Sequence, residues 1–294
     1  MAGAEQPFDD RDGKIWFDGE LVDWRDAKVH ILTHALHYAS SVFEGARAYS
    51  GTVFKLREHN ERLIASAEML GMTMTQSVEE LDEAVIQTLK ANNLTDAYVR
   101  PLVWRGAEQM GVAAERATIH HSVAVWSWPS YFSPEAREKG LRLMIADWKR
   151  PSPETIPTKA KAAGLYMICT LTKHKATAEG YDDALMMDWR GQVAECTGAN
   201  IFFRQGDVLH TPTPDCFLDG ITRRTAMELA RARGIEVVER TIMPEEMADF
   251  EECFITGTAA EITPIGEIGP YKFTVGEITR NLMQDYDDLV NGRS

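Results

Sequence analysis

The segment Ile156–Tyr166 places two lysines among small residues and next to a tyrosine. It reads Ile-Pro-Thr-Lys-Ala-Lys-Ala-Ala-Gly-Leu-Tyr, with amines at Lys159 and Lys161. Small neighbours let a flat cofactor approach the backbone, and a packed, partly desolvated setting helps a lysine amine to lose its proton. Such an amine can form a Schiff base with an aldehyde. Composition alone leaves open the simpler interpretation, a lysine in a surface loop, which explains most such segments.

Further along the chain, two predicted turns have the features of anion-binding sites. The run Leu218–Thr222 leads through Gly220 into a predicted helix, where free backbone N–H groups would point outward. The run Thr256–Glu261 follows a predicted strand, and its small residues offer amides and hydroxyls to a second anion. Either turn taken alone is more often an ordinary connection between a strand and a helix.

Among the carboxylates, histidines and cysteines we find one candidate site residue, Glu195, and no spacing that predicts a metal site. Glu195 follows a predicted hairpin among small residues, a setting for a buried acceptor, although an isolated glutamate is usually a surface carboxylate. No Cys or carboxylate partner stands at metal-ligand spacing from a histidine, so we interpret these as packing or surface residues: His37, His59, His120 and His121. The cysteines are far apart and are predicted to be buried free thiols: Cys169, Cys196, Cys216 and Cys253.

The elements that must position these residues alternate between helix and strand, which is typical of a mixed α/β protein. Ser77 and Glu80 form a capping box before a helix reaching about Ala91. Other helices are predicted to end at Gly71 and to span Thr222–Arg233. Strands are predicted at Ala97–Val103, Ser122–Trp128, Leu141–Trp148, Ala184–Asp188, Asn200–Arg204 and Glu252–Thr256, with a hairpin turn at Asp188–Gly191.

The length of 294 residues exceeds what a single core usually reaches, so two domains are expected. Residues 129–139, with two prolines and several charges, interrupt the regular pattern and predict a connector. We therefore expect a small N-terminal α/β domain at 1–130, an interdomain loop at 131–139 and a larger C-terminal α/β domain at 140–294 that carries the lysine segment.

Charge and hydropathy exclude several function classes. The formal charge of −14 is spread along the chain and repels phosphate backbones, so nucleic-acid binding is not expected. Short acidic runs such as Glu251-Glu252 are interpreted as solvated faces. No apolar segment approaches the roughly 20 residues that span a bilayer, and the acidic N-terminus is unlike a targeting peptide. We expect a cytoplasmic protein without a membrane partner.

Taken together, the segments resemble the branched-chain aminotransferases of pyridoxal-phosphate (PLP) fold type IV. The likeness runs from about Ile15 to Leu289 and includes REHNERL around Arg62. Its strongest parts, in the family's order and near its spacing, are HALHYASSVFEGARAY, AYVRPLVWRG, IPTKAKAAGLY, ECTGANIFF, GITRRTAMELA and TGTAAEITP. The resemblance implies a two-domain α/β fold, like that of D-amino-acid aminotransferases, with the active site between the domains.

The resemblance assigns PLP as the cofactor and a role to each matching residue. Lys161 is the Schiff-base lysine, whereas Lys159 occupies a position where the family tolerates other residues. Glu195 should bind the pyridine nitrogen and Tyr166 the phenolic oxygen, while Leu218 packs against the ring. The phosphate should be held by Arg62, the Gly220 turn with the backbone of Ile221 and Thr222, and the Thr258 hydroxyl.

The same resemblance implies a pocket that accepts both a branched aliphatic side chain and the side chain of glutamate. The apolar wall is assigned to Phe43, Trp128, Tyr131 and Tyr166, with Tyr38 and Val112 from a neighbouring subunit, which implies at least a homodimer. Arg100, supported by Arg47, should bind the distal carboxylate of glutamate. The α-carboxylate should meet Thr258 and Ala259, assisted by Tyr98.

The implied function is ping-pong transamination between leucine, isoleucine or valine and 2-oxoglutarate, in branched-chain amino-acid biosynthesis. Alternatives with the same fold are a D-amino-acid aminotransferase, an (R)-selective amine transaminase and a lyase acting on aminodeoxychorismate; Tyr98, Arg100 and the loop Met110–Val112 favour the branched-chain interpretation. A non-catalytic PLP-binding protein is disfavoured because the matching lysine and glutamate are present. The loop at 104–112 and Cys196-Thr197 depart from the family pattern and leave the order of preference among the substrates open.

Overall fold

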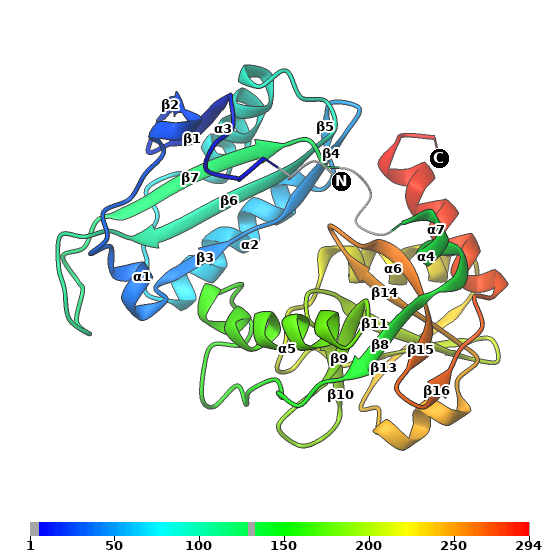
Figure 1. The fold of residues 1–294 in the computed structure, drawn as a ribbon. Coiled ribbons are helices and arrows are strands. Elements are labelled where there is room, and N and C mark those ends of the chain that lie inside the picture. The colour runs from blue at the N-terminus through cyan, green and yellow to red at the C-terminus, as the bar shows by residue number, and fades with distance from the viewer. Residues whose placement is uncertain (1–5, 129–132, 294) are drawn as a thin grey trace. The chain divides into compact units, whose positions relative to one another are not determined.

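The computed structural model describes residues 6–128 and 133–293 (Figure 1). The chain forms two compact units, one of Met1–Trp128 with Ala160–Gly164 and the other of Pro129–Lys159 with Leu165–Ser294. Each unit has its own sheet and its own helices, which confirms the predicted mixed α/β class. Among the described helices, none is both long enough and apolar enough to cross a membrane.

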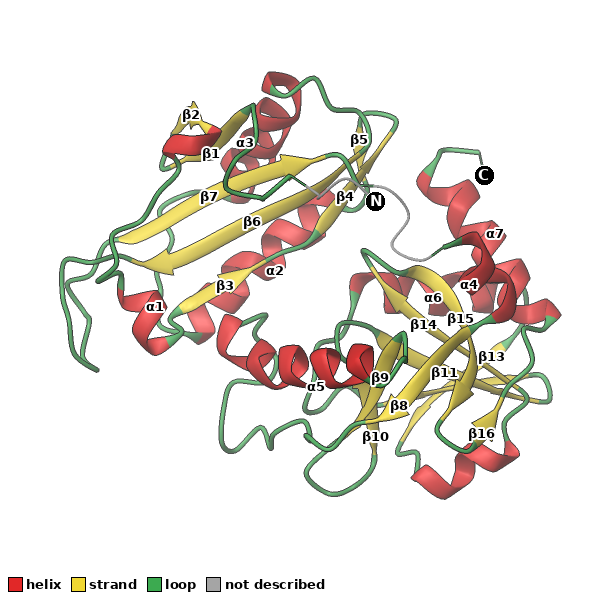
Figure 2. Cartoon of the chain, in the orientation of Figure 1, coloured by secondary structure: helices red, strands yellow, loops and turns green. Residues whose placement is uncertain are grey.

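The first unit is built on an antiparallel sheet of seven described strands. Their order is β2-β1-β7-β6-β4-β5, and β3 pairs with β6 outside this path. The strands are β1 (Lys14–Phe17), β2 (Glu20–Asp23), β3 (Ser41–Phe43), β4 (Ala46–Tyr49), β5 (Thr52–Val53), β6 (Ala97–Arg105) and β7 (Ile119–Trp126). The helices are η1 (Trp24–Asp26), α1 (His34–Tyr38), α2 (Leu56–Met69) and α3 (Val78–Ala91). Figure 2 shows α2 and α3 on the same face of the β6–β7 sheet.

Alternation along β6 and β7 separates a core face from a polar and aromatic face. Val99 and Val125 pack with Ala84 and Val85 of α3 in a buried cluster. Because successive strand residues point to opposite faces, the neighbours of these valines point away from that cluster. The face opposite α3 therefore carries Tyr98 and Arg100.

The second unit contains a mixed sheet of nine described strands. Their order is β10-β9-β8-β15-β14-β11-β12-β13, and β16 pairs with β15. The strands are β8 (Leu141–Ile145), β9 (Asp183–Met187), β10 (Val193–Cys196), β11 (Asn200–Gln205), β12 (Val208–Pro212), β13 (Glu236–Arg240), β14 (Glu252–Gly257), β15 (Glu261–Ile268) and β16 (Tyr271–Lys272). The helices are α4 (Pro134–Lys139), α5 (Met167–Ala178), α6 (Ile221–Ala232), η3 (Pro244–Asp249) and α7 (Glu277–Val290). The short helix η2 (Ala163–Tyr166) begins in the first unit and ends in the second.

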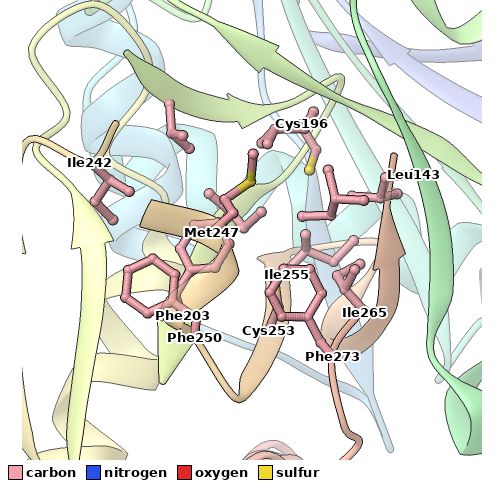
Figure 3. Packing of buried hydrophobic residues seen from close by; sticks show 14 of the residues in the cluster. Leu143, Cys196, Phe203, Ile242, Met247, Phe250, Cys253, Ile255, Ile265 and Phe273 are labelled. Atoms are coloured by element: carbon pink, nitrogen blue, oxygen red, sulfur yellow. The ribbon is translucent and has the colours of Figure 1, made fainter. Parts of the chain in front are cut away.

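The main core of the second unit joins its central strands to the η3 segment (Figure 3). The rings of Phe203 and Phe250 stack with their centroids 4.8 Å apart, and Met247 lies in the same cluster. Each large apolar side chain buried in this way stabilises the fold by roughly 1.5–3 kcal/mol. The four cysteines are buried and free, as the sequence predicted.

Local sequence signals predicted the principal elements well. The Ser77–Glu80 capping box is present, with the Glu80 amide donating to Ser77 Oγ at 3.3 Å. The hairpin turn is confirmed by the bond from Gly191 N to Asp188 O, at a glycine with φ of +90°. All six predicted strands exist, but β7 begins at Ile119 because its ladder with β6 runs on to Arg105.

One local element was not predicted, and one local expectation was wrong. The predicted connector, described at residues 133–139, contains helix α4, because Ser133 Oγ accepts from the Ala136 amide at 3.2 Å and Pro134 suits the first helical position. In the run Glu251-Glu252, the side chain of Glu252 is only 2% exposed, and its carboxylate accepts from the backbone amide and hydroxyl of Thr279 on α7. A buried helix end, not solvent, holds this carboxylate.

The segment Ala160–Gly164 packs with the first unit, whereas the sequence analysis grouped it with residues 140–294. The Phe43 amide donates to Lys161 O at 3.1 Å, and the Lys161 amide donates to Ser66 Oγ at 3.0 Å. Val42 and Ala162 form an antiparallel bridge. These contacts join residues far apart in the chain, which a division by chain order cannot detect.

Candidate active site

Lys161 is the better placed of the two lysines. Its backbone is fixed by the bonds to Phe43 and Ser66, and its Nζ lies 5.2 Å from the centroid of the Phe43 ring. The side chain is half-buried between the buried residues Ala160 and Ala162, whereas Lys159 is exposed. A packed, anchored amine suits covalent and proton-transfer chemistry, so the geometry supports the choice of Lys161.

One face of helix α2 carries polar side chains that meet a buried carboxylate. His59, Arg62 and Ser66 are spaced three and four residues apart and so share that face. Arg62 contacts Glu44 through Nε to Oε1 at 2.6 Å and Nη2 to Oε2 at 3.0 Å. His59 Nδ1 lies 2.7 Å from Glu44 Oε2. The arginine expected to hold a phosphate is therefore held by a two-point ion pair.

Burial and neighbouring charges fix the protonation of this cluster. Burial disfavours the Glu44 carboxylate, but the charge of Arg62 and the hydrogen bond from His59 outweigh it and hold the pKa of Glu44 well below its usual range. Burial also lowers the pKa of His59, against the raising effect of Glu44. At neutral pH Glu44 is charged, and neutral His59 donates its Nδ1–H to the carboxylate.

The opposite face of the β6 strand presents an arginine surrounded by aromatic rings. The Arg100 guanidinium carbon lies 4.9 Å from the ring centroid of Phe43, 5.2 Å from that of Tyr98 and 5.9 Å from that of Trp126. Its Nη2 donates to Tyr98 Oη at 3.3 Å, and its buried Nε has no hydrogen-bond partner among the described residues. Within residues 6–128 and 133–293, no carboxylate pairs with Arg100.

The neighbouring positions complete an aromatic wall around Arg100. The Tyr98 ring lies 5.2 Å from the ring of Trp128. A Cβ on Gly45 would lie 2.0 Å from Tyr98 Oη, so only glycine allows this hydroxyl to reach its position. Arg47 is the cross-strand partner of Tyr98 and lies over the Tyr49 ring at 4.9 Å. The structure thus brings Tyr98, Arg100 and Arg47, three of the residues predicted to bind the substrate, to one sheet face.

Tyr38 and Val112 are exposed, by 44% and 87% respectively. His34 connects them: its ring stacks on Tyr38 at 4.5 Å, and its Nε2 lies 2.9 Å from Gly111 O. Exposed side chains held in this way are accessible to another protein surface. The predicted wall residue Tyr131 lies outside the described residues.

In the second unit, Glu195 on β10 faces a buried arginine. Arg150 Nε lies 3.3 Å from Glu195 Oε1, and Asn200 Nδ2 donates to Glu195 Oε2 at 3.3 Å. Burial opposes the charged form of Arg150, but the Glu195 carboxylate, together with weaker contributions from neighbouring groups, outweighs it and raises the pKa of Arg150. Tyr166, half-buried at the end of η2, also interacts electrostatically with Arg150. Glu195 therefore has the charge partner that a partly buried carboxylate requires.

The N-terminus of α6 is assembled around Asn200. Asn200 Nδ2 donates to Leu218 O at 3.0 Å, and a Cβ on Gly220 would lie 2.2 Å from Asn200 Oδ1. Gly220 is the N-cap and supplies no side chain to the first amides of the helix, at Ile221 and Thr222. Backbone N–H groups at such an end, with the helix dipole, favour an anion.

The second predicted turn links β14 to β15. Thr258 and Ala259 are half-buried there, directly after Gly257. A Cβ on Gly257 would lie 3.3 Å from Gly198 O, so the turn passes close to the backbone beside Asn200. The strand before the turn pairs Thr256 with Asn200. Asn200 is therefore a common neighbour of Glu195, of the α6 N-terminus and of the strand that leads into this turn.

The sequence analysis did not identify the residues that contact and position the predicted site residues. Glu44, Arg150 and Asn200 were not singled out, and His59 was interpreted as packing or surface. The i, i+3, i+7 spacing of polar residues on α2 was a detectable signal for His59 and Ser66. No comparable local pattern marks Arg150, because its partner lies 45 residues later.

Each unit carries groups that suit part of a phosphorylated pyridine aldehyde. In the first unit, a fixed arginine suits a phosphate and the anchored Lys161 suits an aldehyde carbon. In the second unit, an uncapped helix N-terminus suits a phosphate and the Glu195 carboxylate suits a pyridinium nitrogen. Described residues that could supply metal ligands gather at Asp188, Asp215 and Cys216, where Arg190 already pairs with both aspartates.

Comparisons with known proteins agree with this chemistry. Residues 41–268, more than half of the chain, match the family model for amino-transferase class IV. The branched-chain-amino-acid aminotransferase of Pseudomonas aeruginosa is 42% identical, over 97% of this chain and 95% of that protein. The crystal structure of the Escherichia coli branched-chain amino acid aminotransferase is 39% identical, with a TM-score of 0.93, and covers 97% of this chain and 96% of that one.

A further solved structure, the branched-chain amino acid aminotransferase of Thermobaculum terrenum in its PLP form, is 30% identical with a TM-score of 0.88. It covers 96% of this chain and 95% of that one. The two solved structures each cover at least 96% of this chain, so these matches extend over both units. The chain therefore belongs to the class IV aminotransferase family.

Proposed function

We propose that this protein transfers amino groups between branched-chain L-amino acids (leucine, isoleucine and valine) and 2-oxoglutarate. The observation that carries the proposal is the Arg100 guanidinium, lodged among Phe43, Tyr98 and Trp126 without a carboxylate partner among the described residues. Aromatic rings suit an aliphatic side chain, and the guanidinium suits the distal carboxylate of glutamate. One wall therefore serves two unlike substrates in turn.

The cofactor is pyridoxal 5′-phosphate, which carries the amino group and takes up electrons when the substrate loses its Cα proton. Arg62, the amides of Ile221 and Thr222 after Gly220, and the Thr258 hydroxyl would hold its phosphate. Glu195 would bind the pyridine nitrogen with Arg150 as its counter-charge. Leu218 would pack against the ring, and Tyr166 would bind its phenolic oxygen.

The protein's own groups bind the substrate and move one proton. Lys161 would accept the Cα proton of the amino acid in one direction and return it in the other. Thr258 and Ala259, assisted by Tyr98, would bind the α-carboxylate. Arg100, supported by Arg47, would hold the distal carboxylate of 2-oxoglutarate. Because the first keto acid leaves before 2-oxoglutarate enters, the kinetics should be ping-pong.

A homodimer or larger homo-oligomer is part of this proposal. A groove of about 330 Å³ in the first unit is lined by apolar residues that include Val29, Leu36 and Trp104. Ile31 and Leu32 beside it are also exposed. Such an apolar surface is unusual on a monomer, and a second copy covering it would bring Tyr38 and Val112 to the neighbouring site.

The place of the reaction follows from chemistry and from the cysteines. Transamination with glutamate as amino donor is the final step of branched-chain amino-acid biosynthesis, and the reverse step begins their breakdown. Four buried free thiols suit a reducing compartment, so we propose that the enzyme works in the cytoplasm.

The direct test is the absorbance of the purified holoenzyme before and after L-leucine is added without keto acid. The proposal expects conversion of the aldehyde form of the cofactor to the aminated form, reversed by 2-oxoglutarate. Parallel additions of D-alanine and (R)-1-phenylethylamine should leave the spectrum unchanged. Conversion by either of these, with no response to L-leucine, would replace the proposal with one of the other activities of this fold.

A further inference from the structure

Glu44 is a charged residue to which neither the family motifs nor the proposed reaction assigns a role. It follows strand β3 and is 0% exposed. Its carboxylate accepts from Arg62 Nε and Nη2, from His59 Nδ1, and from the Gly45 amide at 3.2 Å. A carboxylate with no solvent contact thus has several donors, two of them from one guanidinium.

The two-point contact determines how Arg62 is oriented. Oε1 meets Nε at 2.6 Å and Oε2 meets Nη2 at 3.0 Å, so the planes of carboxylate and guanidinium are aligned. An arginine side chain otherwise samples many rotamers. The Arg62 side chain is 16% exposed, so its head is not sealed in as Glu44 is. The carboxylate holds the guanidinium from the buried side.

His59 in turn holds Glu44. Burial lowers the pKa of His59, and the nearby charges of Arg62 and Lys161 act in the same direction, so the ring is neutral at neutral pH. A neutral imidazole adjacent to a carboxylate donates through one nitrogen, here Nδ1 at 2.7 Å. The carboxylate therefore receives a donor that adds no further charge.

Stability alone is a weak explanation for this arrangement. Burying an ion pair costs desolvation energy that a packed apolar pair does not, so such pairs are poor stabilisers. The same helix face also carries Ser66, which binds the Lys161 amide. One rigid helix thus fixes both the arginine and the lysine that the cofactor needs, which favours a role in function.

We propose that Glu44 is a positioning residue that orients Arg62 toward the cofactor phosphate, with His59 holding Glu44 in place. This inference rests on the proposed function, in which Arg62 binds the phosphate. The Glu44 carboxylate also repels the phosphate and partly neutralises the charge of Arg62, which lowers the affinity for the phosphate. The proposal states that the affinity gained by fixing the guanidinium exceeds this loss.

The test compares PLP with pyridoxal, which lacks the phosphate, in titrations of the apoprotein followed by cofactor absorbance. In Glu44→Gln the amide cannot accept from both guanidinium nitrogens. We expect the dissociation constant of PLP to rise about tenfold, the cost of ordering one long side chain, with that of pyridoxal unchanged. Tighter or unchanged PLP binding would overturn the proposal, and so would equal weakening of both ligands.

Glu252→Gln is the matched control. Glu252 is also a buried carboxylate paired with an arginine, Arg204 Nη1 at 3.1 Å, but it holds α7 in the second unit. Its loss should lower the unfolding temperature without changing the ratio of PLP to pyridoxal affinity. If Glu252→Gln changed that ratio as much as Glu44→Gln, the effect would be one of general stability and the proposal would fail.

Two further variants complete the test. Glu44→Asp distinguishes an effect of orientation from an effect of charge, and Arg62→Lys distinguishes failure of this inference from failure of the proposed function. Glu44→Asp keeps the charge but withdraws it by one methylene, so PLP should again weaken relative to pyridoxal; wild-type affinity would contradict positioning. In Arg62→Lys, adding Glu44→Gln should cost no further PLP affinity, because residues acting as one unit are not additive. If Arg62→Lys left the affinity for PLP unchanged, the proposed phosphate site would be wrong. If Arg62→Lys weakened PLP binding but the Glu44 variants did not, only the inference about Glu44 would be wrong.

Discussion

Arg62 and Arg100 lie in the same unit, yet their guanidinium groups have opposite surroundings. Arg62 is clasped by the buried Glu44 carboxylate, whereas Arg100 is surrounded by aromatic rings and pairs with no carboxylate among the described residues. The first arrangement suits a ligand that stays, since a fixed donor needs no reorganisation. The surroundings of Arg100 suit a site that binds a charged and an apolar side chain in turn. The guanidinium can bind a carboxylate, and the rings supply apolar contact.

The largest expected effect concerns Lys161, on which both proposed half-reactions depend. Lys161→Gln removes the group proposed to move the Cα proton and should slow both half-reactions about 10²- to 10⁴-fold. Rapid mixing with L-leucine or 2-oxoglutarate would measure this. Lys159→Ala is the control and should keep the cofactor-linked species that borohydride traps; loss of trapping in Lys159→Ala but not in Lys161→Gln would reverse the assignment.

A smaller effect comes from giving Arg100 the kind of partner that Arg62 has. Ala124 is its direct cross-strand partner on β7, so Ala124→Glu places a carboxylate within reach. A charge-assisted bond of about 1.5–3 kcal/mol would compete with 2-oxoglutarate and reduce its half-reaction roughly 10- to 100-fold. Ala124→Gln has the same size without the charge and should reduce it much less; equal losses in both variants would show that bulk, not charge, was responsible.

The smallest effect extends the comparison to two buried histidines. His59 has a carboxylate partner, whereas both ring nitrogens of His121 lack a hydrogen-bond partner among the described residues, and this side chain is 2% exposed. Burial lowers the pKa of His121 to about 4. Its neutral form therefore stabilises the fold fully above the unfolded pKa of about 6.5, and that stability is lost as the pH falls toward 4.

Between pH 7.5 and pH 5 this linkage corresponds to about 2 kcal/mol of unfolding free energy. His121→Phe keeps an aromatic ring in contact with Trp16 and removes the titrating group. Denaturant unfolding at the two pH values should therefore show a smaller loss of stability in the variant than in the wild type. An equal loss in both proteins would mean that His121 is not the group responsible.

The parts of this account that sequence predicts are those encoded locally. The Ser77–Glu80 capping box and the glycine at 191 act within a few residues, and both are present in the structure. The chemistry of Lys161 and Glu195 came from motifs, since neither residue is distinctive by composition. For the same reason, the roles of the individual site residues remain predictions.

What the sequence did not indicate depends on contacts between distant segments. Glu44 and Arg62 are 18 residues apart, and Arg150 and Glu195 are 45 apart, so no periodic pattern connects them. The burial of Glu252 was missed because adjacent acidic residues usually face solvent, and only the start of α7 explains the exception. Charge partners deep in a fold follow from packing, which local patterns do not specify.

The central claim, that one aromatic wall with the Arg100 guanidinium serves both substrates, is tested most directly with Arg100→Met. Single-turnover rates of the two half-reactions, followed by cofactor absorbance, should differ sharply. We predict that the 2-oxoglutarate half-reaction falls about 30-fold or more, because a distal carboxylate loses its half-buried partner, while the L-leucine half-reaction changes less than about threefold. Equal losses in the two half-reactions would contradict the account.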